Sequence, residues 1–223
     1  SRRDGTVQSL ALSALVKNYT LFPGNFLRDA AGNLVAIDSR WVNAGQTITK
    51  GVDINARLQG RLTDARWAVV LDGSYLLEKK SRLIASAPFG ASEVGVFTRA
   101  GDLGLRWKHS LTGTYTRGAW TGTLQHLYRS GYDDYVLPGV ANGTIVPPNW
   151  SPEVKAYQLW NTSVAYTGIK NLTLTLGVKN LLDKDPPFSA AYDGNTGAGS
   201  SWEPRVADPR GRSFTFQIDY KFF

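Results

Sequence analysis

The side chains that most often perform catalysis or bind transition metals are scarce in this sequence. It has no cysteine, and its two histidines are His109 and His126. Disulfides, thiolate zinc sites and cysteine nucleophiles are therefore excluded. The GxSxG, GxGxxG and phosphate-loop motifs are also missing, so neither a nucleophilic serine nor a nucleotide site is indicated. We predict that the protein is not an enzyme and uses no cofactor.

Two pairs of aspartates could supply oxygen ligands to a Ca²⁺ ion. Asp133 and Asp134 are adjacent, and Asp183 and Asp185 are separated by one residue. Aspartates in such segments more commonly cap turns and loop edges by accepting backbone hydrogen bonds. We favour capping for both pairs. The two histidines share their face with no carboxylate, so we predict no metal site there either.

The dominant pattern in the sequence is a strict alternation of apolar and polar residues. In residues 214–222 every second side chain is apolar and those between are polar. A period of two is typical of β-strands and does not arise from a helix. Eight segments show it, and they are residues 6–17, 47–59, 66–77, 104–116, 120–130, 155–166, 172–178 and 214–222. We therefore predict an all-β, antiparallel fold in which residues 1–223 form one domain.

The connections between these segments alternate between short and long. The short ones lie near residues 61–65, 117–119 and 167–171, and the long ones, none of which resembles a helix, span residues 18–46, 78–103, 131–154 and 182–210. Outer-membrane barrels have short periplasmic turns and long extracellular loops. No apolar run approaches the ~20 residues of a membrane-spanning helix, whereas a barrel strand needs only ~10. The pattern predicts a transmembrane β-barrel segment of about eight strands.

The hairpin of residues 104–130 gives the height of the apolar face. A two-residue turn at residues 117–118 would pair Tyr115 with Trp120. In the same register His109 faces His126, and aromatic pairs stand at both ends of one face, about 20 Å apart for tilted strands. Barrels carry an apolar band ~25 Å tall between aromatic girdles. The predicted girdle residues are Trp107, Tyr115, Trp120, Tyr128, Tyr220 and Phe222.

Positive charge is in excess but is not concentrated. The chain has 25 Lys and Arg against 18 Asp and Glu, a formal charge of +7. These residues do not gather with stacking aromatics on one face, so we predict no nucleic-acid binding. Inward charges and loop aromatics suit sugar rings or flat chelates, although loop aromatics could equally pack on one another or on the outer leaflet. The candidate ligand-binding residues are Arg106, Lys108, Arg129, Tyr132, Tyr135, Trp150, Tyr192 and Trp202.

Three stretches of the sequence carry a family resemblance. Residues 41–55 contain WVNAG followed by KGVDIN, residues 177–183 are GVKNLLD, and residues 208–223 run from DPRGR into the last alternating segment. In this order and spacing they resemble the C-terminal part of a TonB-dependent outer-membrane receptor. In that family the last strand ends on an apolar-face Phe. Phe222 matches that position, with Phe223 as an extra residue, and both are candidates for the assembly signal.

The resemblance implies a barrel of about 22 strands with a plugged lumen. It implies energised uptake of a scarce ligand, such as an iron-siderophore, a cobalamin or a glycan, across the bacterial cell outer membrane. The implied partners are outer-membrane lipid, the barrel-assembly machinery, the TonB system acting through the plug, and a small-molecule ligand. Since plug and first strands are missing, we expect the natural chain to begin before Ser1 and the isolated segment to be a curved sheet with edges at residues 6–17 and 213–222.

Two other interpretations remain. A self-contained barrel of eight strands could act as an anchor or adhesin, because eight strands suffice to close a small barrel. The excess of positive inward residues, among them Arg106, Lys108 and Arg129, favours a wider lumen. A soluble β-sandwich would also place large residues on one face, and it would be recovered without detergent.

Overall fold

The structure is a computed structural model that describes the chain in two compact units. The described residues are all except 1, 5, 6, 9–11, 40, 41, 44, 83–87, 99–101, 137, 147, 149, 150, 191–200 and 223. Unit 1 comprises Ser1–Lys50 and Lys79–Ser92, and unit 2 comprises Gly51–Glu78 and Glu93–Phe223. None of the helices formed by these described residues has the length and apolar character to cross a membrane.

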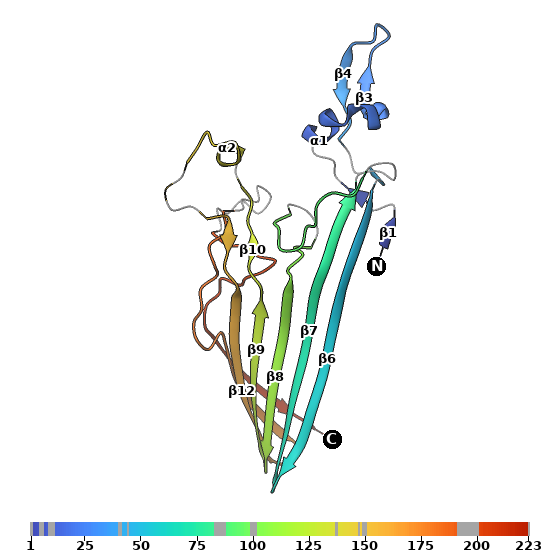
Figure 1. Cartoon of the computed structure of the whole chain (residues 1–223). Coiled ribbons are helices and arrows are strands. Elements are labelled where there is room, and N and C mark those ends of the chain that lie inside the picture. Colours follow the sequence, from blue (N-terminus) through green and yellow to red (C-terminus); the bar gives the residue numbers. More distant parts are fainter. Residues whose placement is uncertain are drawn as a thin grey trace. The chain divides into compact units, whose positions relative to one another are not determined.

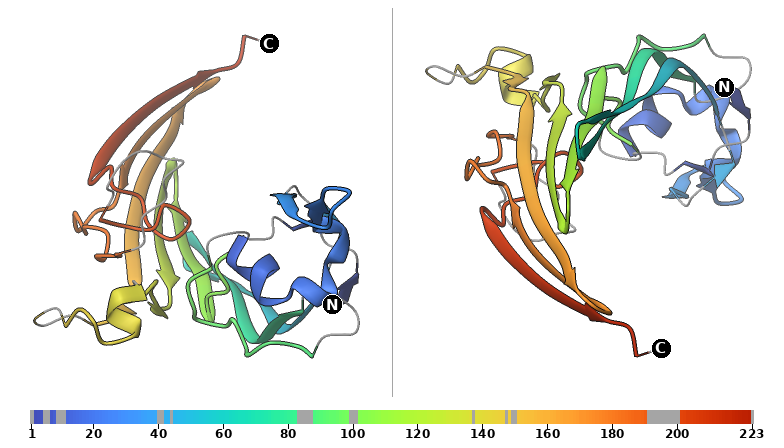
Figure 2. Two further views of the ribbon diagram at one scale, coloured as in Figure 1. Left: turned by 90° about the horizontal axis from the view of Figure 1, so that it is seen from above. Right: turned by 90° about the horizontal axis from the view of Figure 1, so that it is seen from below.

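One antiparallel sheet has the strand order β1, β6, β7, β8, β9, β12, β13, β14 (Figure 1). The strands are β1 (Arg2–Asp4), β6 (Gln46–Leu62), β7 (Ala65–Arg82), β8 (Trp107–Arg117), β9 (Trp120–Arg129), β12 (Tyr157–Ile169), β13 (Leu172–Lys179) and β14 (Ser213–Tyr220). The all-β, antiparallel prediction is confirmed. Within unit 2 the strands from β8 to β14 follow a curve (Figure 2). Among the described residues β14 pairs only with β13, so the sheet does not close into an eight-stranded barrel.

Short turns join the strands at one end and long connections join them at the other, as predicted (Figure 1). The turns between β6 and β7, between β8 and β9, and between β12 and β13 have two residues each. One residue of each turn has a positive φ, namely Thr63 (55°), Gly118 (57°) and Asn171 (62°). Left-handed backbone of this kind matches the twist of the flanking strands in tight hairpins.

The predicted register of the β8–β9 hairpin is wrong by one step of the alternation. The turn residues are Gly118 and Ala119, so Arg117 pairs with Trp120, and His109 pairs with Tyr128 instead of His126. The reason is the turn geometry, since a hairpin with positive φ only at its first turn residue favours glycine in that place. The partner moves by two residues, so every side chain keeps the face that the alternation predicted.

The strand predicted at residues 6–17 is also wrong. The structure forms β2 (Val7–Gln8) there, paired with β5 (Val42–Asn43), and then the helix α1 (Leu12–Lys17). Residues 11–17 consist mainly of Ala, Leu and Lys, which favour helices, and Leu15 is buried against Phe22. The edge of the sheet is instead β1, which pairs with the first residues of β6.

The long connections contain short elements, contrary to the expectation that none forms a helix. Unit 1 has two 3-10 helices, η1 (Tyr19–Leu21) and η2 (Pro23–Asn25), followed by a hairpin of β3 (Phe26–Arg28) and β4 (Leu34–Ile37). Unit 2 has β10 (Tyr132–Asp133) paired with β11 (Glu153–Val154), and the single-turn helix α2 (Pro138–Ala141). Pro138 supplies a fixed φ at the start of that turn, where its missing N–H costs nothing.

Candidate functional site

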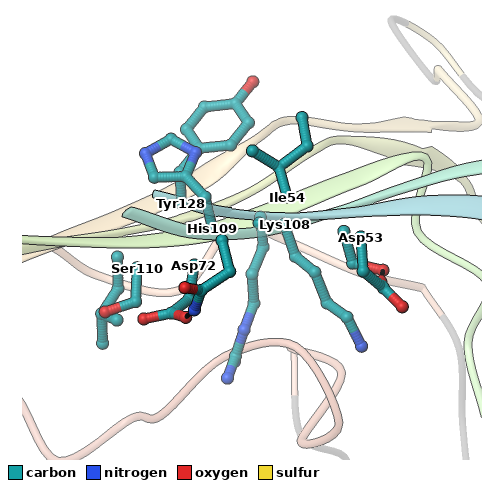
Figure 3. A pocket seen from close by; sticks show the side chains of 12 residues that line it. Asp53, Ile54, Asp72, Lys108, His109, Ser110 and Tyr128 are labelled. Atoms are coloured by element: carbon teal, nitrogen blue, oxygen red, sulfur yellow. Dashed lines mark hydrogen bonds between the residues drawn. The ribbon is translucent and has the colours of Figure 1, made fainter. Parts of the chain in front are cut away.

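The two faces of the unit 2 sheet differ in chemistry where the strands approach the long loops. Figure 3 shows Asp53, Asp72 and Lys108 on one side of the ribbon, and His109 and Tyr128 on the other. The alternation of side chains along β6, β7 and β8 produces this division. We call the first side the polar face and the second the apolar face.

Carboxylates on the polar face are held by neighbouring strands. The Ser74 hydroxyl donates to Asp53 Oδ1 at 2.7 Å. The Asn55 amide donates to Asp72 Oδ1. Lys108 of β8 lies on the same side (Figure 3). Acidic and basic groups therefore lie together on this part of the polar face.

A chain of hydrogen bonds continues along the polar face from β8 across β9 and β12 to the end of β13. Gln125 Nε2 donates to Ser110 Oγ at 3.1 Å, and Asn161 Nδ2 donates to Gln125 Oε1 at 2.9 Å. The backbone N–H of Asn180, which follows β13, donates to Asn161 Oδ1 at 2.9 Å. Neutral amides and hydroxyls thus present a hydrogen-bonding surface. Within the described part of the chain, no group of three or more His, Asp and Glu side chains is placed to hold a metal ion.

The apolar face is exposed over its whole width. Trp120 is 56% exposed and Phe214 is 71% exposed. At the short-turn end Trp120 packs on Tyr166, with ring centroids 4.5 Å apart, and at the end of the chain Tyr220 packs on Phe222 at 5.0 Å. An apolar surface of this extent is unfavourable in contact with water, and it is typical of a face that contacts another protein or a membrane.

The long connections of unit 2 fold together into a loop cluster with its own apolar core. The buried core residues are Leu103, Leu105, Tyr132, Val154, Tyr157, Val206 and Ala207. Phe97, Leu159 and Trp202 pack against them. Because these residues come from separate connections, their burial holds the connections to one another.

Asp134 is the main polar link within the loop cluster. Its side chain is buried, and Oδ1 accepts hydrogen bonds from the Tyr135 backbone N–H at 2.8 Å and from Ser189 Oγ at 3.0 Å. Oδ2 accepts from the Ala190 backbone N–H at 2.5 Å. Asp183 similarly accepts from the Arg212 backbone N–H at 2.7 Å. For these two aspartates the predicted capping role is confirmed.

Polar and charged groups fix residues 201–212, the final part of the last connection, to the strands and to one another. Arg129 donates to the Val206 carbonyl, and the Tyr157 hydroxyl donates to the Asp208 carbonyl at 3.1 Å. Arg210 binds the Asp208 carboxylate and lowers its pKa to about 2. These contacts hold the final part of the long connection at the loop end of the sheet.

Two further titratable groups are buried in the loop cluster. Burial raises the pKa of Tyr132 to about 12. Burial also raises the pKa of Glu203, but hydrogen bonds from Arg205, 2.8 Å away, outweigh it and leave the pKa below its usual value. Both groups therefore keep their ordinary charge at neutral pH, which suits a structural cluster better than acid–base catalysis.

A comparison with protein-family models matches residues 13–181 to the family described as TonB dependent receptor-like, beta-barrel. The chain belongs to this family. Members of the TonB-dependent receptor family are receptors and transporters of the outer membrane. A search of curated protein sequences gives no match.

Two solved structures are similar to the chain. One is the siderophore receptor PiuA from Acinetobacter baumannii, with 19% identity and a TM-score of 0.49. The other is the copper transporter OprC, with 17% identity and a TM-score of 0.47. Each alignment covers 82% of this chain, and the chain spans about a quarter of each structure, 23% and 24% respectively.

The structure places the predicted charged residues in different surroundings. Lys108 lies on the polar face, and Arg106 is exposed just before β8. Arg129 donates a hydrogen bond to the Val206 carbonyl. These residues lie near the loop end of β8 and β9, where the sheet meets the loop cluster.

The predicted loop aromatics are packed to different degrees. Tyr132 is buried in the loop cluster, at 4% exposure. Tyr135 is half-buried with its ring 6.1 Å from that of Phe97, and Trp202 is half-buried against the core. Trp150, Tyr192 and Phe223 lie outside the described residues. Trp202 and Tyr135 therefore keep part of their surface available to a ligand.

Sequence reasoning missed the residues that organise this region. Ser189 was not predicted, and Asn180 entered only as part of the stretch GVKNLLD, without a structural role, although both are buried and hydrogen-bonded. Asn180 has a positive φ of 51°, and its amide bonds both the N–H and the carbonyl of Lys184. An Asn directly after an alternating segment is a usable signal, because asparagine tolerates left-handed backbone at a turn.

Proposed function

We propose that this chain forms part of the wall of an outer-membrane receptor that takes up a small ligand with energy supplied through TonB. The supporting observation is the division of one sheet into a continuous exposed apolar face and a hydrogen-bonded polar face, in a chain of the TonB-dependent receptor family. The apolar face contacts outer-membrane lipid, and the polar face lines the lumen. Trp107, Tyr115, Trp120, Tyr128, Tyr220 and Phe222 form the aromatic girdles. The barrel-assembly machinery recognises the end of the last strand, with Phe222 and Phe223.

The ligand contacts we propose are the side chains at the loop end of the wall. Lys108 and Arg106 offer positive charge, and Trp202 and Tyr135 offer partly exposed rings beside the loop cluster. Arg129, Tyr132, Trp150 and Tyr192 complete the proposed set. Positive groups and rings together favour an anionic chelate or a sugar, because charge steers the ligand and a ring packs on its flat face.

Uptake by living cells tests this function. Cells that express the protein are given radiolabelled ferric siderophores, cyanocobalamin or maltodextrins, with and without a working TonB system. We expect uptake of one of these ligands to fall to background when either the protein or TonB is removed. Uptake that continues without TonB, or no uptake of any of the three, would contradict the proposal.

A matched pair of variants tests the ligand contacts. Trp202→Ala should raise the Kd of the ligand found in that assay, because it removes a ring beside the loop cluster. Trp120→Ala removes the same ring from the apolar face at the opposite end of the strands, and it should leave the Kd unchanged. Equal Kd values for Trp202→Ala and the unmodified protein would remove Trp202 from the site.

A further inference from the structure

Four side chains on the apolar face form one continuous chain of hydrogen bonds across β8, β9 and β12. Trp107 Nε1 donates to His109 Nδ1 at 2.8 Å. His109 Nε2 lies 3.2 Å from His126 Nδ1. His126 Nε2 lies 3.2 Å from Gln158 Oε1. We call this set the histidine chain.

The first residue fixes the direction of every bond in the histidine chain. An indole N–H can only donate, so His109 Nδ1 must accept. A neutral His109 then carries its proton on Nε2 and donates to His126 Nδ1. His126 in turn carries its proton on Nε2 and donates to the Gln158 carbonyl oxygen. All four ring nitrogens are satisfied when both imidazoles are neutral.

The same direction argues against a metal ion between the two histidines. Two nitrogens 3.2 Å apart could both ligate one zinc ion at the usual 2.0–2.1 Å. His109 would then need its proton on Nδ1, where it would meet the Trp107 N–H. Within the described residues no third histidine or carboxylate joins the pair to complete a site. The geometry therefore favours a proton over a metal in this position.

The groups that surround the histidine chain are aromatic. Tyr128 of β9 stacks on His109 with centroids 5.4 Å apart, and Trp160 of β12 stacks on His126 at 4.4 Å. Tyr75 of β7 lies 6.3 Å from Trp107. The titratable groups facing the histidines are thus the phenols of Tyr75 and Tyr128. Lys108, the sequence neighbour of His109, points to the opposite face (Figure 3).

We propose that the histidine chain is a proton-sensitive side-chain link between β8, β9 and β12, which forms at neutral pH in addition to the backbone hydrogen bonds of these strands and breaks in acid. Histidine is the side chain that ordinarily changes charge between about pH 5 and 8. A second proton on His109 would place an N–H against the Trp107 N–H, and a second proton on His126 would do the same against His109. Each protonation therefore replaces a hydrogen bond by two opposed donors. The link depends on strand geometry and not on what is transported.

Amide hydrogen exchange on the protein in outer-membrane vesicles tests the link. Protection is compared at about pH 7.5 and about pH 5, after correction for the intrinsic effect of pH. We expect protection of residues 126–130 and 157–160 to fall about tenfold or more in acid, the effect of losing a hydrogen bond. Residues 112–116 and 121–124, nearer the short turns, should not change. Equal behaviour of the two regions would overturn the proposal.

Variants separate titration of the histidines from a general effect of acid. The double variant His109→Gln, His126→Gln leaves no titratable group in the histidine chain, so the acid-dependent loss of protection should disappear. Tyr128→Phe keeps both histidines and should retain it. A double variant that keeps the acid response would overturn the proposal. Nitrogen NMR of the unmodified protein is independent of these variants, and a proton found on Nδ1 of either histidine at neutral pH would overturn it too.

Discussion

Replacement of Asp134 by alanine should open the loop cluster while leaving the strands intact. The buried carboxylate accepts two hydrogen bonds from the last connection, one from Ser189 Oγ and one from the Ala190 backbone N–H. Ser189 is itself only 2% exposed. In Asp134→Ala both donors lose their acceptor in a place that water does not easily reach. The connections would then keep their apolar contacts and backbone hydrogen bonds, such as the one from the Asp134 N–H to the Pro152 carbonyl, but would lose this buried polar link.

The size of the effect follows from the number and type of bonds lost. A hydrogen bond to a charged group contributes about 1.5–3 kcal/mol, so two of them contribute about 3–6 kcal/mol to closure of the loop cluster. Each 1.4 kcal/mol is a factor of ten in an equilibrium constant. Opening should therefore become about 10² to 10⁴ times more frequent. Asp134→Asn keeps one acceptor oxygen but sets an amide N–H₂ against the second donor, and it should lose about half of that free energy.

Amide hydrogen exchange measures this opening directly, because exchange in a closed cluster waits for local opening. Residues 188–190 and 201–203 should exchange faster in Asp134→Ala, whereas residues in β8 and β9 should keep their protection. Asp133→Ala is the matched control, since the neighbouring side chain is exposed. If Asp134→Ala exchanges at the same rate as Asp133→Ala, the carboxylate does not hold the connections together and the reasoning fails.

Two further predictions concern a buried tyrosine and a glycine under a ring. Because burial raises the pKa of Tyr132 from 10.0 to about 12, the stability it contributes is full below pH 10 and is lost as the pH rises towards 12. The difference in phenolate absorbance between the unmodified protein and Tyr132→Phe should appear near pH 12, and a difference near pH 10 would show that the side chain is not buried. In Gly73→Val the new Cβ would overlap the Trp107 ring, which should cost about 1–3 kcal/mol and lower the thermal unfolding temperature in detergent. Gly122→Val has open space and should not, so equal temperatures would show that the ring moves aside freely.

The strands could be predicted from the sequence because their pattern is local. In β14 the apolar residues Phe214, Phe216 and Ile218 all fall on one face, and β13 shows the same alternation beside it. Alternation also assigned the faces of β8 and β9 correctly when the register was wrong, since a shift of two residues leaves the side of each residue unchanged. The exact register depended on the backbone at Gly118, which alternation does not describe.

The helix α1 and the loop cluster could not be predicted in the same way. Residues 11–17 contain residues that favour a helix beside an incomplete alternation, and burial of Leu15 against Phe22 decides between them. Asp134 bonds Ser189, which lies 55 residues further along the chain. No local sequence pattern predicts a contact between residues so far apart in the sequence. The ligand contacts proposed for Lys108 and Trp202 remain predictions for the same reason.

The alternation of the strands also bears on how such a chain reaches its membrane. A polypeptide secreted through one membrane before it enters another must not stop in the first, and long apolar runs are what halt translocation. Here the mean hydropathy is only −0.23, and polar residues alternate with apolar ones along much of the strands. The apolar face forms only when the strands place their apolar side chains on one side of the sheet. Formation of the sheet therefore creates the continuous apolar surface.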